Sequence, residues 1–494
     1  MAISKALCPC TPCCKWKNME VTAWALDSSA RGAMVISGIF LGVALLRTAK
    51  VAAGCTLCLD DTLDPLPPVG VNATCTEDPP CDGKVYGFKP SSLLAVMGTV
   101  VGLLAAITMP IIGAVIDHTN LRWKIGAITA FLLVAINVVQ TSISQATWSL
   151  VAFLQIAAPY IYLVHCVVQY AYLPELTNDK NVLSDITAQC NMWQFMTQVF
   201  YIMIVVAATG ATGADAIGSA RISQILLVIW SGVFFYIPWA EMFQERPALH
   251  SVPEGESLLT LGFRRLKKTV AEMRSDFNSV FRMLIAVSFA EAGANAFTTI
   301  AVTYCDEVMG MTSTETSLLI LVCLVTAVPA SLLFARLTRY IGAHKSYMLS
   351  LVWWGVVTLV APFFMSGPEH KANTYLFGVL WGMGFGWIYP TQRALYCLII
   401  PGGQESELMG IYIFAGQILV WLPPAIFTLL NEADVSMKWG LASDACFFFV
   451  ALAVTYVMGD FEIAQMKAKE TLGKRVMGAQ ADGGDEEAVN LSNV

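Results

Sequence analysis

Several ionisable side chains in this sequence stand inside long apolar stretches, where a buried charge is costly and therefore indicates function. Asp27 and Arg31 are one helical turn apart, a spacing that favours an ion pair between them. The alternative is direct contact with a substrate or a gate. Histidine is the side chain that most often changes protonation in mildly acidic compartments, so His165 is either a proton-responsive group or a buried, neutral, hydrogen-bonded histidine.

A carboxylate also stands near the middle of a later apolar stretch. Glu291 is about nine residues into that stretch, or ~14 Å at ~1.5 Å per residue of helix, which is near the centre of a bilayer. Asn295 follows one turn later on the same face. Because desolvation disfavours a charged carboxylate, Glu291 is a candidate proton carrier. The alternative is a carboxyl group that hydrogen-bonds to another helix.

Other kinds of chemistry find no support in the sequence. No serine or cysteine nucleophile can be placed beside a histidine and an acid, and no phosphate-binding Gly-x-x-x-x-Gly-Lys-Ser/Thr loop occurs. We therefore expect neither an enzyme nor an ATP-driven pump, and we predict no cofactor and no metal site. The net charge is −7, and much of the acidity lies in the carboxy-terminal tail. Nothing in the sequence favours nucleic acid binding.

The candidate residues need membrane helices to position them. The chain has 494 residues, of which 56% are hydrophobic and only 13% are charged, as is typical of proteins whose solvent is lipid. About twelve segments approach the ~20 apolar residues needed to cross a bilayer as a helix. The sequence therefore predicts an all-α integral membrane protein with spans at 24–46, 90–116, 125–143, 148–171, 189–208, 221–240, 282–303, 314–334, 346–365, 374–393, 408–430 and 439–458.

One long polar segment divides the spans six and six. The predicted parts are a tail at 1–23, a first half at 24–240, a linker at 241–281, a second half at 282–458 and an acidic disordered tail at 459–494. Pro390 and the Pro423–Pro424 pair predict interruptions of the tenth and eleventh spans, of the kind that line cavities. Gly38 and Gly42 have Gly-x-x-x-Gly spacing, which we attribute to packing within one chain, so a monomer is expected.

The distribution of basic residues predicts the orientation. With the amino terminus inside, most of the 29 Lys and Arg residues fall on the cytosolic side. Both termini are then cytosolic, and the first loop at 47–89 is lumenal or extracellular. On that oxidising side, four cysteines predict two disulfides, with zinc binding or unpaired thiols as alternatives: Cys55, Cys58, Cys75 and Cys81. The sequon at Asn72 could be glycosylated there.

Two cytosolic segments favour contact with the bilayer surface. Four cysteines beside lysines just before the first span predict acylation, with metal binding or no modification as alternatives: Cys8, Cys10, Cys13 and Cys14. In the linker, apolar residues recur at helical spacing from Leu259 to Phe277, while basic residues fill other faces. This predicts an amphipathic helix that lies on an anionic leaflet or packs on the protein's own cytosolic face.

The architecture and one local motif resemble the major facilitator superfamily. Gly113, Asp117 and Arg122 stand between the second and third spans and are similar to the superfamily's Gly-x-x-x-Asp-Arg-x-Gly-Arg-Arg loop. In such a loop an acidic residue at a helix end is held by basic partners and acts as a latch between conformations. The resemblance implies a small-molecule substrate near the midplane between the halves.

A second motif resembles the vacuole effluxer family of that superfamily. Arg393 is followed by Pro401-Gly-Gly-Gln-Glu405-Ser-Glu407-Leu-Met-Gly-Ile-Tyr412, which is similar to the family's Pro-x-Gly-x-Glu-Ser-Glu-Phe-Phe-Gly-x-Tyr segment after an Arg. Read without the family, Glu405 and Glu407 stand at the start of a helix and serve either as helix caps or as gating groups.

The resemblance implies a secondary transporter that exports neutral amino acids from a vacuole or lysosome by alternating access, with a link to autophagy. The membrane of residence would then be vacuolar or lysosomal, with the plasma membrane as an alternative. Its substrate or coupling candidates are Asp27, Arg31, His165, Glu291, Asn295 and Arg393. The alternatives are a proton-coupled carrier of a sugar, nucleoside or organic acid, and a membrane receptor or scaffold.

Overall fold

The computed structural model describes residues 19–54, 83–172, 180–248, 258–400, 405–459 and 466. Apart from one β-bridge between Val85 and Phe88, these residues form helices and their connections. The helices of the first half are α2 (Met19–Ala52), α3 (Leu93–His118), α4 (Arg122–Gln140), α5 (Trp148–Tyr172), α6 (Lys180–Thr212) and α7 (Ala216–Ile237). Two short segments, η1 (Pro90–Ser92) and η3 (Pro238–Met242), accompany them.

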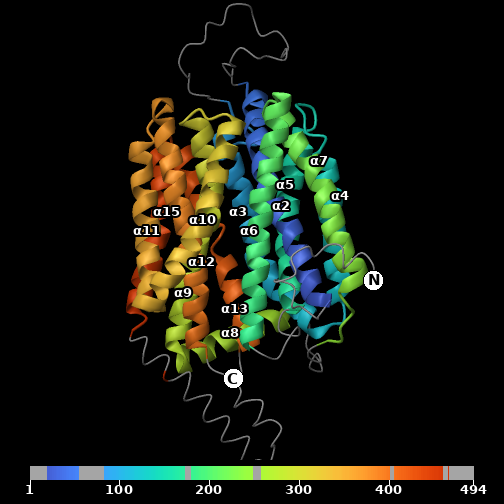
Figure 1. Cartoon of the computed structure of the whole chain (residues 1–494), viewed down its shortest axis with the longest axis vertical. Coiled ribbons are helices and arrows are strands. Elements are labelled where there is room, and N and C mark those ends of the chain that lie inside the picture. Colours follow the sequence, from blue (N-terminus) through green and yellow to red (C-terminus); the bar gives the residue numbers. More distant parts are fainter. Residues whose placement is uncertain are drawn as a thin grey trace, which may run out of the picture.

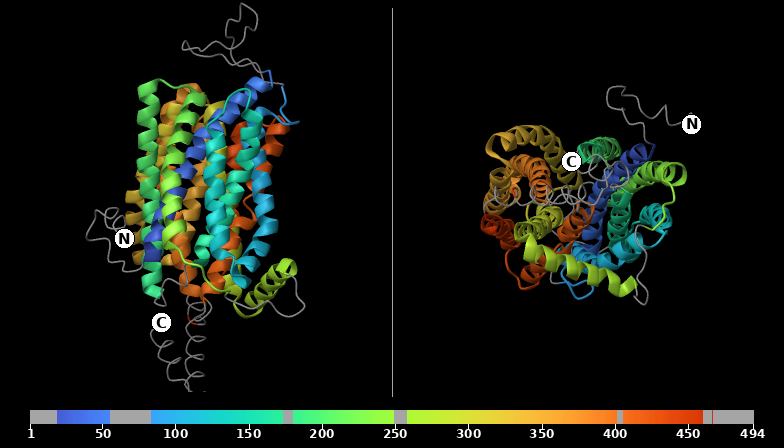
Figure 2. Two further views of the ribbon diagram at one scale, coloured as in Figure 1. Left: turned by 90° about the vertical axis from the view of Figure 1, so that its right-hand side faces the viewer. Right: turned by 90° about the horizontal axis from the view of Figure 1, so that it is seen from below.

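The second half begins after the linker helix α8 (Leu258–Asp276). Its helices are α9 (Asn278–Glu307), α10 (Ser313–Ile341), α11 (Ala343–Phe364), α12 (Lys371–Ile399), α13 (Glu405–Ile418), α14 (Leu422–Glu432) and α15 (Met437–Val457), with η4 (Pro368–His370) before α12. The helices stand roughly parallel in two groups, and α8 lies across one end of the bundle (Figures 1 and 2). We call the end with α8 the linker face and the opposite end, with Ala52 and Pro90, the first-loop face.

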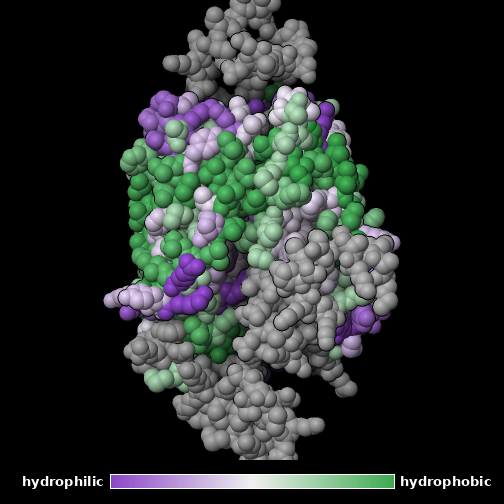
Figure 3. Space-filling view, viewed as in Figure 1, coloured by the Kyte–Doolittle hydropathy of each residue, from purple (hydrophilic) through white to green (hydrophobic). Residues whose placement is uncertain are grey.

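Eleven helices in the described part of the chain are long and apolar enough to cross a membrane. They match every predicted span except 374–393, whose helix α12 carries many glycines and several Trp, Tyr and polar residues. Helix α12 nevertheless spans 29 residues and packs along α10 inside the bundle. On the face seen in Figure 3, an apolar band covers the helices between two more polar ends. The predicted all-α membrane fold is therefore confirmed.

A row of glycines explains how the polar helix α12 is accommodated. Gly378, Gly382 and Gly386 recur every four residues along the side that faces α10. A Cβ on Gly382 would lie 2.3 Å from the carbonyl oxygen of Cys323, and one on Gly386 would lie 2.3 Å from that of Ala327. The two backbones therefore touch, which is how small residues hold membrane helices together. The sequence analysis had overlooked this glycine row.

The two predicted helix interruptions have different outcomes. The eleventh span is broken between α13 and α14, directly before Pro423 and Pro424, as predicted. The prediction for the tenth span is wrong, because α12 continues through Pro390. A proline in a membrane helix is tolerated where the freed backbone group can be satisfied, and Pro390 borders the central cavity described below.

Helix α2 is longer than the predicted span 24–46. It begins at Met19 and ends at Ala52, so it includes the charged Glu20, Arg47 and Lys50. These charges have partners elsewhere in the fold: Glu20 pairs with Arg246, and both Arg47 and Lys50 pair with Asp306. Pairing lets a helix carry charged residues at a depth that hydropathy alone would not allow.

The linker contains the predicted amphipathic helix, and it packs on the protein's own linker face. Helix α8 lies against α3 and α9, so closely that a Cβ on Gly262 would meet the carbonyl oxygen of Pro110 at 2.1 Å. Within α8, Thr269 and Met273 are buried on the inner side, whereas Lys267 and Arg274 are exposed. The packed alternative is confirmed, and contact of the basic side with a leaflet stays a prediction.

The glycine contact between α10 and α12 predicts a large effect from a single methyl group. We expect Gly382→Ala to lower the apparent melting temperature in detergent, because the added carbon must displace backbone rather than a flexible side chain. Gly232→Ala is the matched control, since Gly232 lies in α7 with nothing within 4 Å of a Cβ. Equal melting temperatures for the two variants would contradict the assigned contact.

Candidate functional site

A cavity of about 2370 Å³ lies between the two halves. Both halves and α8 contribute to its wall. Six of the predicted functional residues line it: Arg31, Gly113, Asp117, Glu291, Asn295 and Arg393. Asp27, His165 and Arg122 are fully buried and do not border it. The structure therefore divides the predicted set into a cavity wall and a supporting layer.

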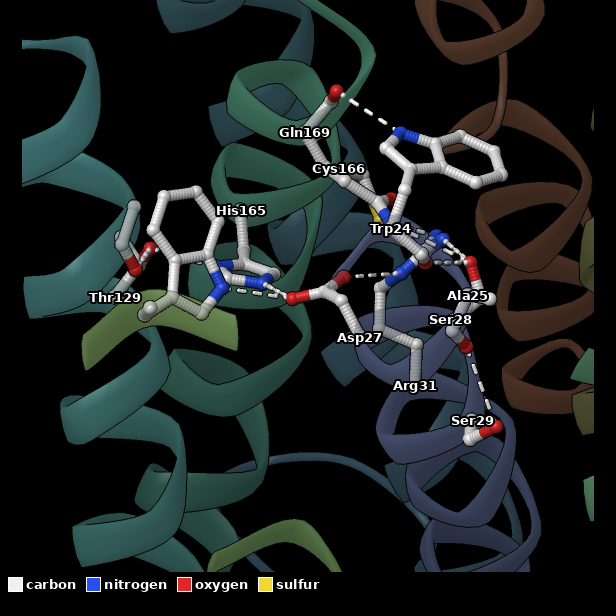
Figure 4. Close-up of polar contacts among 12 residues, drawn as sticks. Trp24, Ala25, Asp27, Ser28, Ser29, Arg31, Thr129, His165, Cys166 and Gln169 are labelled. Atoms are coloured by element: carbon white, nitrogen blue, oxygen red, sulfur yellow. Dashed lines mark hydrogen bonds and ion pairs between the residues drawn. The ribbon is translucent and has the colours of Figure 1, made fainter. Parts of the chain in front are cut away.

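The supporting layer of the first half is built around Asp27. Its Oδ2 accepts a hydrogen bond from the Arg31 Nε at 3.1 Å, which confirms the ion pair predicted from their spacing. Its Oδ1 lies 2.8 Å from the His165 Nε2 and accepts a hydrogen bond from the Trp239 Nε1 at 2.8 Å (Figure 4). Asp27 has no exposed surface, so these donors replace the water that a carboxylate requires.

His165 connects this carboxylate to a fourth element. Its Nδ1 lies 2.8 Å from the Thr129 Oγ1 of α4, and that hydroxyl is also within reach of the Ile125 and Gly126 carbonyl oxygens. A hydroxyl can donate to a neutral imidazole or accept from a protonated one. Thr129 therefore fastens the His165 ring to α4.

The wall of the second half carries a polar cluster centred on Gln392. The Gln392 Nε2 donates to the Glu291 Oε1 and to the Tyr412 hydroxyl, each at 2.8 Å. The Tyr347 hydroxyl donates to the Gln392 Oε1 at 3.0 Å. Asn295 lies one turn from Glu291, as predicted, and its Nδ2 is 3.3 Å from the Glu291 Oε2. Glu291 thus has the hydrogen bonds to another helix that the sequence analysis gave as its alternative role.

Arg393 differs from every other charged residue of the cavity wall. It follows Gln392 on α12 and borders the cavity together with Tyr389 and Tyr412. Among the described residues its guanidinium makes no hydrogen bond or ion pair. A guanidinium offers five N–H donors in a planar fork that matches a carboxylate. An anionic group in the cavity would therefore meet a charged, unpaired donor.

The superfamily-like motif lies at the linker face of the first half. The Arg122 guanidinium carbon lies 5.5 Å from the centre of the Tyr172 ring, and its Nη1 is 3.4 Å from the Ala171 carbonyl oxygen. Arg122 thus fastens the start of α4 to the end of α5. Gly113 borders the cavity with open space where a Cβ would stand. A gating role for this motif stays a prediction.

Ion pairs between the halves close the first-loop face. Arg47 and Lys50 at the end of α2 contact Asp306 at the end of α9, at 3.4 and 2.9 Å. Lys50 also contacts Glu307 at 2.9 Å. We call these four residues the α2–α9 clamp. The charge distribution places Arg47 and Lys50 on this face, whereas their acidic partners on α9 were not predicted from the sequence.

A second set of contacts joins η1 to the end of α14. The Glu432 Oε1 accepts from the Lys89 backbone nitrogen at 2.7 Å and from the Ser92 hydroxyl at 2.8 Å. The Lys89 Nζ also pairs with Asp434. This hydrogen bond from Lys89 holds the pKa of the exposed Asp434 carboxyl below its ordinary value. A lowered carboxyl pKa means that the contact is present near neutrality and is lost only as the pH falls through the lowered value.

The remaining predictions fall largely outside the described residues. This is the case for the proposed disulfides of Cys55, Cys58, Cys75 and Cys81, for glycosylation at Asn72, for acylation of Cys8, Cys10, Cys13 and Cys14, and for most of the tail at 459–494. Glu405 begins α13, as predicted, but the structure does not describe the side chains of Glu405 and Glu407.

Comparison with known proteins gives a consistent result. The family model "Vacuole effluxer Atg22 like" matches residues 17–468. The "Uncharacterized MFS-type transporter YxiO" of Bacillus subtilis is 20% identical over 379 residues, which are 74% of this chain and 84% of that protein. Autophagy-related protein 22 of Cryptococcus neoformans is 24% identical over 243 residues, covering 46% of this chain and 44% of the relative. The aligned part is thus less than half of the fungal protein.

Solved structures show the same fold. A mutant of the nucleoside transporter NupG has a TM-score of 0.57 at 12% identity and covers 90% of this chain and 100% of its own. The xylose transporter XylE from E. coli, in an inward open conformation, has a TM-score of 0.57 at 13% identity and covers 89% and 95%. At such identities the likeness shows the major facilitator fold alone.

The Asp27 network predicts an asymmetric response to mutation. We expect Arg31→Met to destabilise the protein by about 3–5 kcal/mol, because it leaves a buried carboxylate without its guanidinium. Adding Asp27→Asn should recover much of this loss. The control is Lys371→Met, which breaks the partly exposed pair with Glu315 and should cost at most about 1 kcal/mol. Thermal unfolding in detergent measures all three, and a double variant no better than the single one would refute the account.

The α2–α9 clamp predicts how Cys305 reacts. Cys305 is buried beside Asp306 and borders the cavity. We expect Asp306→Asn with Glu307→Gln to speed alkylation of Cys305 by a maleimide several-fold, because opening of the first-loop face exposes the thiol. Mass spectrometry of the Cys305 peptide measures the rate. The control Glu315→Gln breaks a pair within one half at the same face and should leave the rate unchanged.

Proposed function

This chain belongs to the Atg22-like vacuole effluxer family, and from that premise we propose that it is a secondary transporter of neutral amino acids. The family and the major facilitator fold make it a membrane transporter of small molecules. Our proposal adds the identity of the cargo, which is a neutral amino acid. It also holds that the protein performs no enzymatic reaction.

The observation that carries the proposal is the pair of opposite groups on the second-half wall. Arg393 borders the cavity with a guanidinium that has no partner among the described residues, and Glu291 of helix α9 borders the same cavity. Glu291 is fixed by Gln392, the residue next to Arg393 in the chain. An amino acid carries a carboxylate and an ammonium a few ångströms apart, so it could place its carboxylate on Arg393 and its ammonium on Glu291.

The rest of the wall fits an uncharged side chain. Phe385, Trp381, Ile411 and Phe414 border the cavity, and Arg31 on the opposite side is already neutralised by Asp27. A charge on the side chain of the cargo would therefore find no free partner among the described groups. This favours neutral over acidic or basic amino acids.

Direction and membrane follow from the family description. We propose export from a vacuolar or lysosomal compartment to the cytosol, with the linker face cytosolic and the first-loop face lumenal. The clamp contacts at the first-loop face and the cavity wall that reaches Asp117 at the linker face fit a conformation that releases cargo to the cytosol. A link to autophagy is proposed from the same family description.

The test compares three cargoes in liposomes containing the purified protein. Leucine carries both charges, leucinamide lacks the carboxylate, and 4-methylpentanoate lacks the ammonium. We expect uptake of leucine only, with the two analogues at least tenfold weaker, since each lost charged hydrogen bond is worth about 1.5–3 kcal/mol. Uptake of either analogue at the rate of leucine would exclude recognition of both charges.

Variants of the two groups sharpen the test. Arg393→Gln should reduce leucine uptake and remove the discrimination against leucinamide, whereas Glu291→Gln should remove the discrimination against 4-methylpentanoate. The matched control is Arg339→Gln, an exposed arginine in the last turn of α10. If Arg393→Gln lowers uptake of every cargo by the same factor, the guanidinium does not bind the carboxylate of the cargo.

A further inference from the structure

A second carboxyl group of the second half is buried without any partner. Asp444 lies in α15, has no exposed surface, and neither of its oxygens makes a hydrogen bond in the described part of the chain. Asp27 has the same burial but is held by donors from three side chains. An ionised carboxylate without such donors is strongly disfavoured in apolar surroundings. Asp444 therefore requires something that the protein groups around it do not supply.

The register between α11 and α15 places one polar group opposite Asp444. These helices run antiparallel and lie side by side (Figure 1). Trp354 stacks on Phe448 at 5.1 Å between ring centres, and Phe363 meets Trp439 at 5.9 Å. Between these two contacts, Thr358 of α11 stands level with Asp444. Thr358 is also fully buried, and its hydroxyl oxygen has no hydrogen-bond partner among the described residues.

Asp444 also lies near helix α9, which forms part of the cavity wall. A Cβ on Gly293 of α9 would touch Phe448, so four residues further along α9 Phe297 comes level with Asp444. Phe297 borders the cavity and packs against Trp354 and Trp381. The indole nitrogens of both tryptophans also lack hydrogen-bond partners. Unsatisfied polar atoms thus gather around Phe297, which is the pattern left by a buried water or a mobile proton.

The chemistry of the neighbours favours a proton over a metal ion. A hard cation such as Na⁺ or Ca²⁺ is held by several oxygen ligands, and this site offers two carboxyl oxygens and one hydroxyl. No group of three or more His, Cys, Asp or Glu residues that could hold a metal occurs among the described residues. The residues level with Asp444 on α9 and α11 are Phe297 and Thr358, and Phe427 of α14 packs on Gly440, so these neighbours place no titratable group against Asp444 in the described part of the chain. The nearest acid on α9, Glu291, is six residues or ~9 Å further along the axis.

We propose that Asp444 is a proton-binding site behind the substrate cavity, holding a carboxylic acid in the conformation described and exchanging its proton with the cavity past Phe297. Binding is simple protonation: the carboxylate takes a proton from cavity water and becomes a neutral acid, which apolar surroundings tolerate far better than the charged form. On release the proton returns to cavity water. Protonation of Asp444 does not depend on the cargo, whereas coupling of this proton to transport rests on the proposed function.

Infrared spectroscopy of the purified full chain tests the protonation without any cargo. A buried carboxylic acid gives a carbonyl stretching band that shifts when H₂O is exchanged for D₂O. We expect such a band in the unaltered protein, its loss in Asp444→Asn, and a change in its frequency in Thr358→Val, because the polar hydroxyl that stands level with the acid on α11 is replaced by a methyl group. Glu291→Gln is the matched control and should leave this band in place. Identical spectra for Asp444→Asn and the unaltered protein would overturn the proposal.

Transport in liposomes tests the coupling. Asp444→Asn mimics the protonated acid, so we expect exchange of cargo between the two sides to persist and accumulation driven by a pH gradient to be lost. If Asp444→Asn still accumulates cargo in response to the pH gradient, the coupling is overturned. The infrared result on the protonation of Asp444 is independent of this outcome. An absent carboxylic acid band together with a requirement for Na⁺ would replace the proton by a cation. Failure of all exchange in the unaltered protein, with the band present, would count against the proposed cargo and not against Asp444.

Discussion

The contacts of the Asp27 carboxylate hold the first half together. One oxygen binds Arg31 on the same helix, and the other binds His165 of α5 and Trp239 of η3, while Thr129 of α4 supports the histidine. Because Asp27 has no exposed surface, these elements must approach closely enough for their side chains to provide its donors. The position of Arg31 at the cavity wall is therefore fixed from behind, by a network that the cargo does not touch.

Three charged groups near the cavity of the second half have fewer partners than Asp27 has. Glu291 is partly satisfied through Gln392, and Arg393 and Asp444 have no partners among the described residues. Groups left unsatisfied near a cavity are available to molecules that come and go, whereas a saturated network is not. Under the proposed function, this asymmetry gives the two halves different roles: the first supplies a fixed surface, and the second supplies groups that are available to bind cargo and protons.

The sequence was sufficient for the membrane class, the division into halves and the break before Pro423, because these depend on local composition. It also predicted that Asp27 pairs with Arg31 and that Asn295 lies beside Glu291, since each pair is one turn apart. It could not predict that His165 and Trp239 meet Asp27, because 138 and 212 residues separate them along the chain. The partners of Glu291 and the clamp at the first-loop face were missed for the same reason. Asp444 was overlooked although a carboxylate in an apolar span is itself a signal.

Helix α2 extends without interruption from Met19 to Ala52, a length of 34 residues or ~51 Å at ~1.5 Å per residue. Its linker-face end is anchored through Glu20, Arg31 lies along the cavity, and its far end carries Arg47 and Lys50 across to the other half. A rod held near one end acts as a lever. A tilt about Glu20 would displace Lys50 further than Arg31, so any movement of α2 at the cavity wall would be linked to the contacts of the α2–α9 clamp.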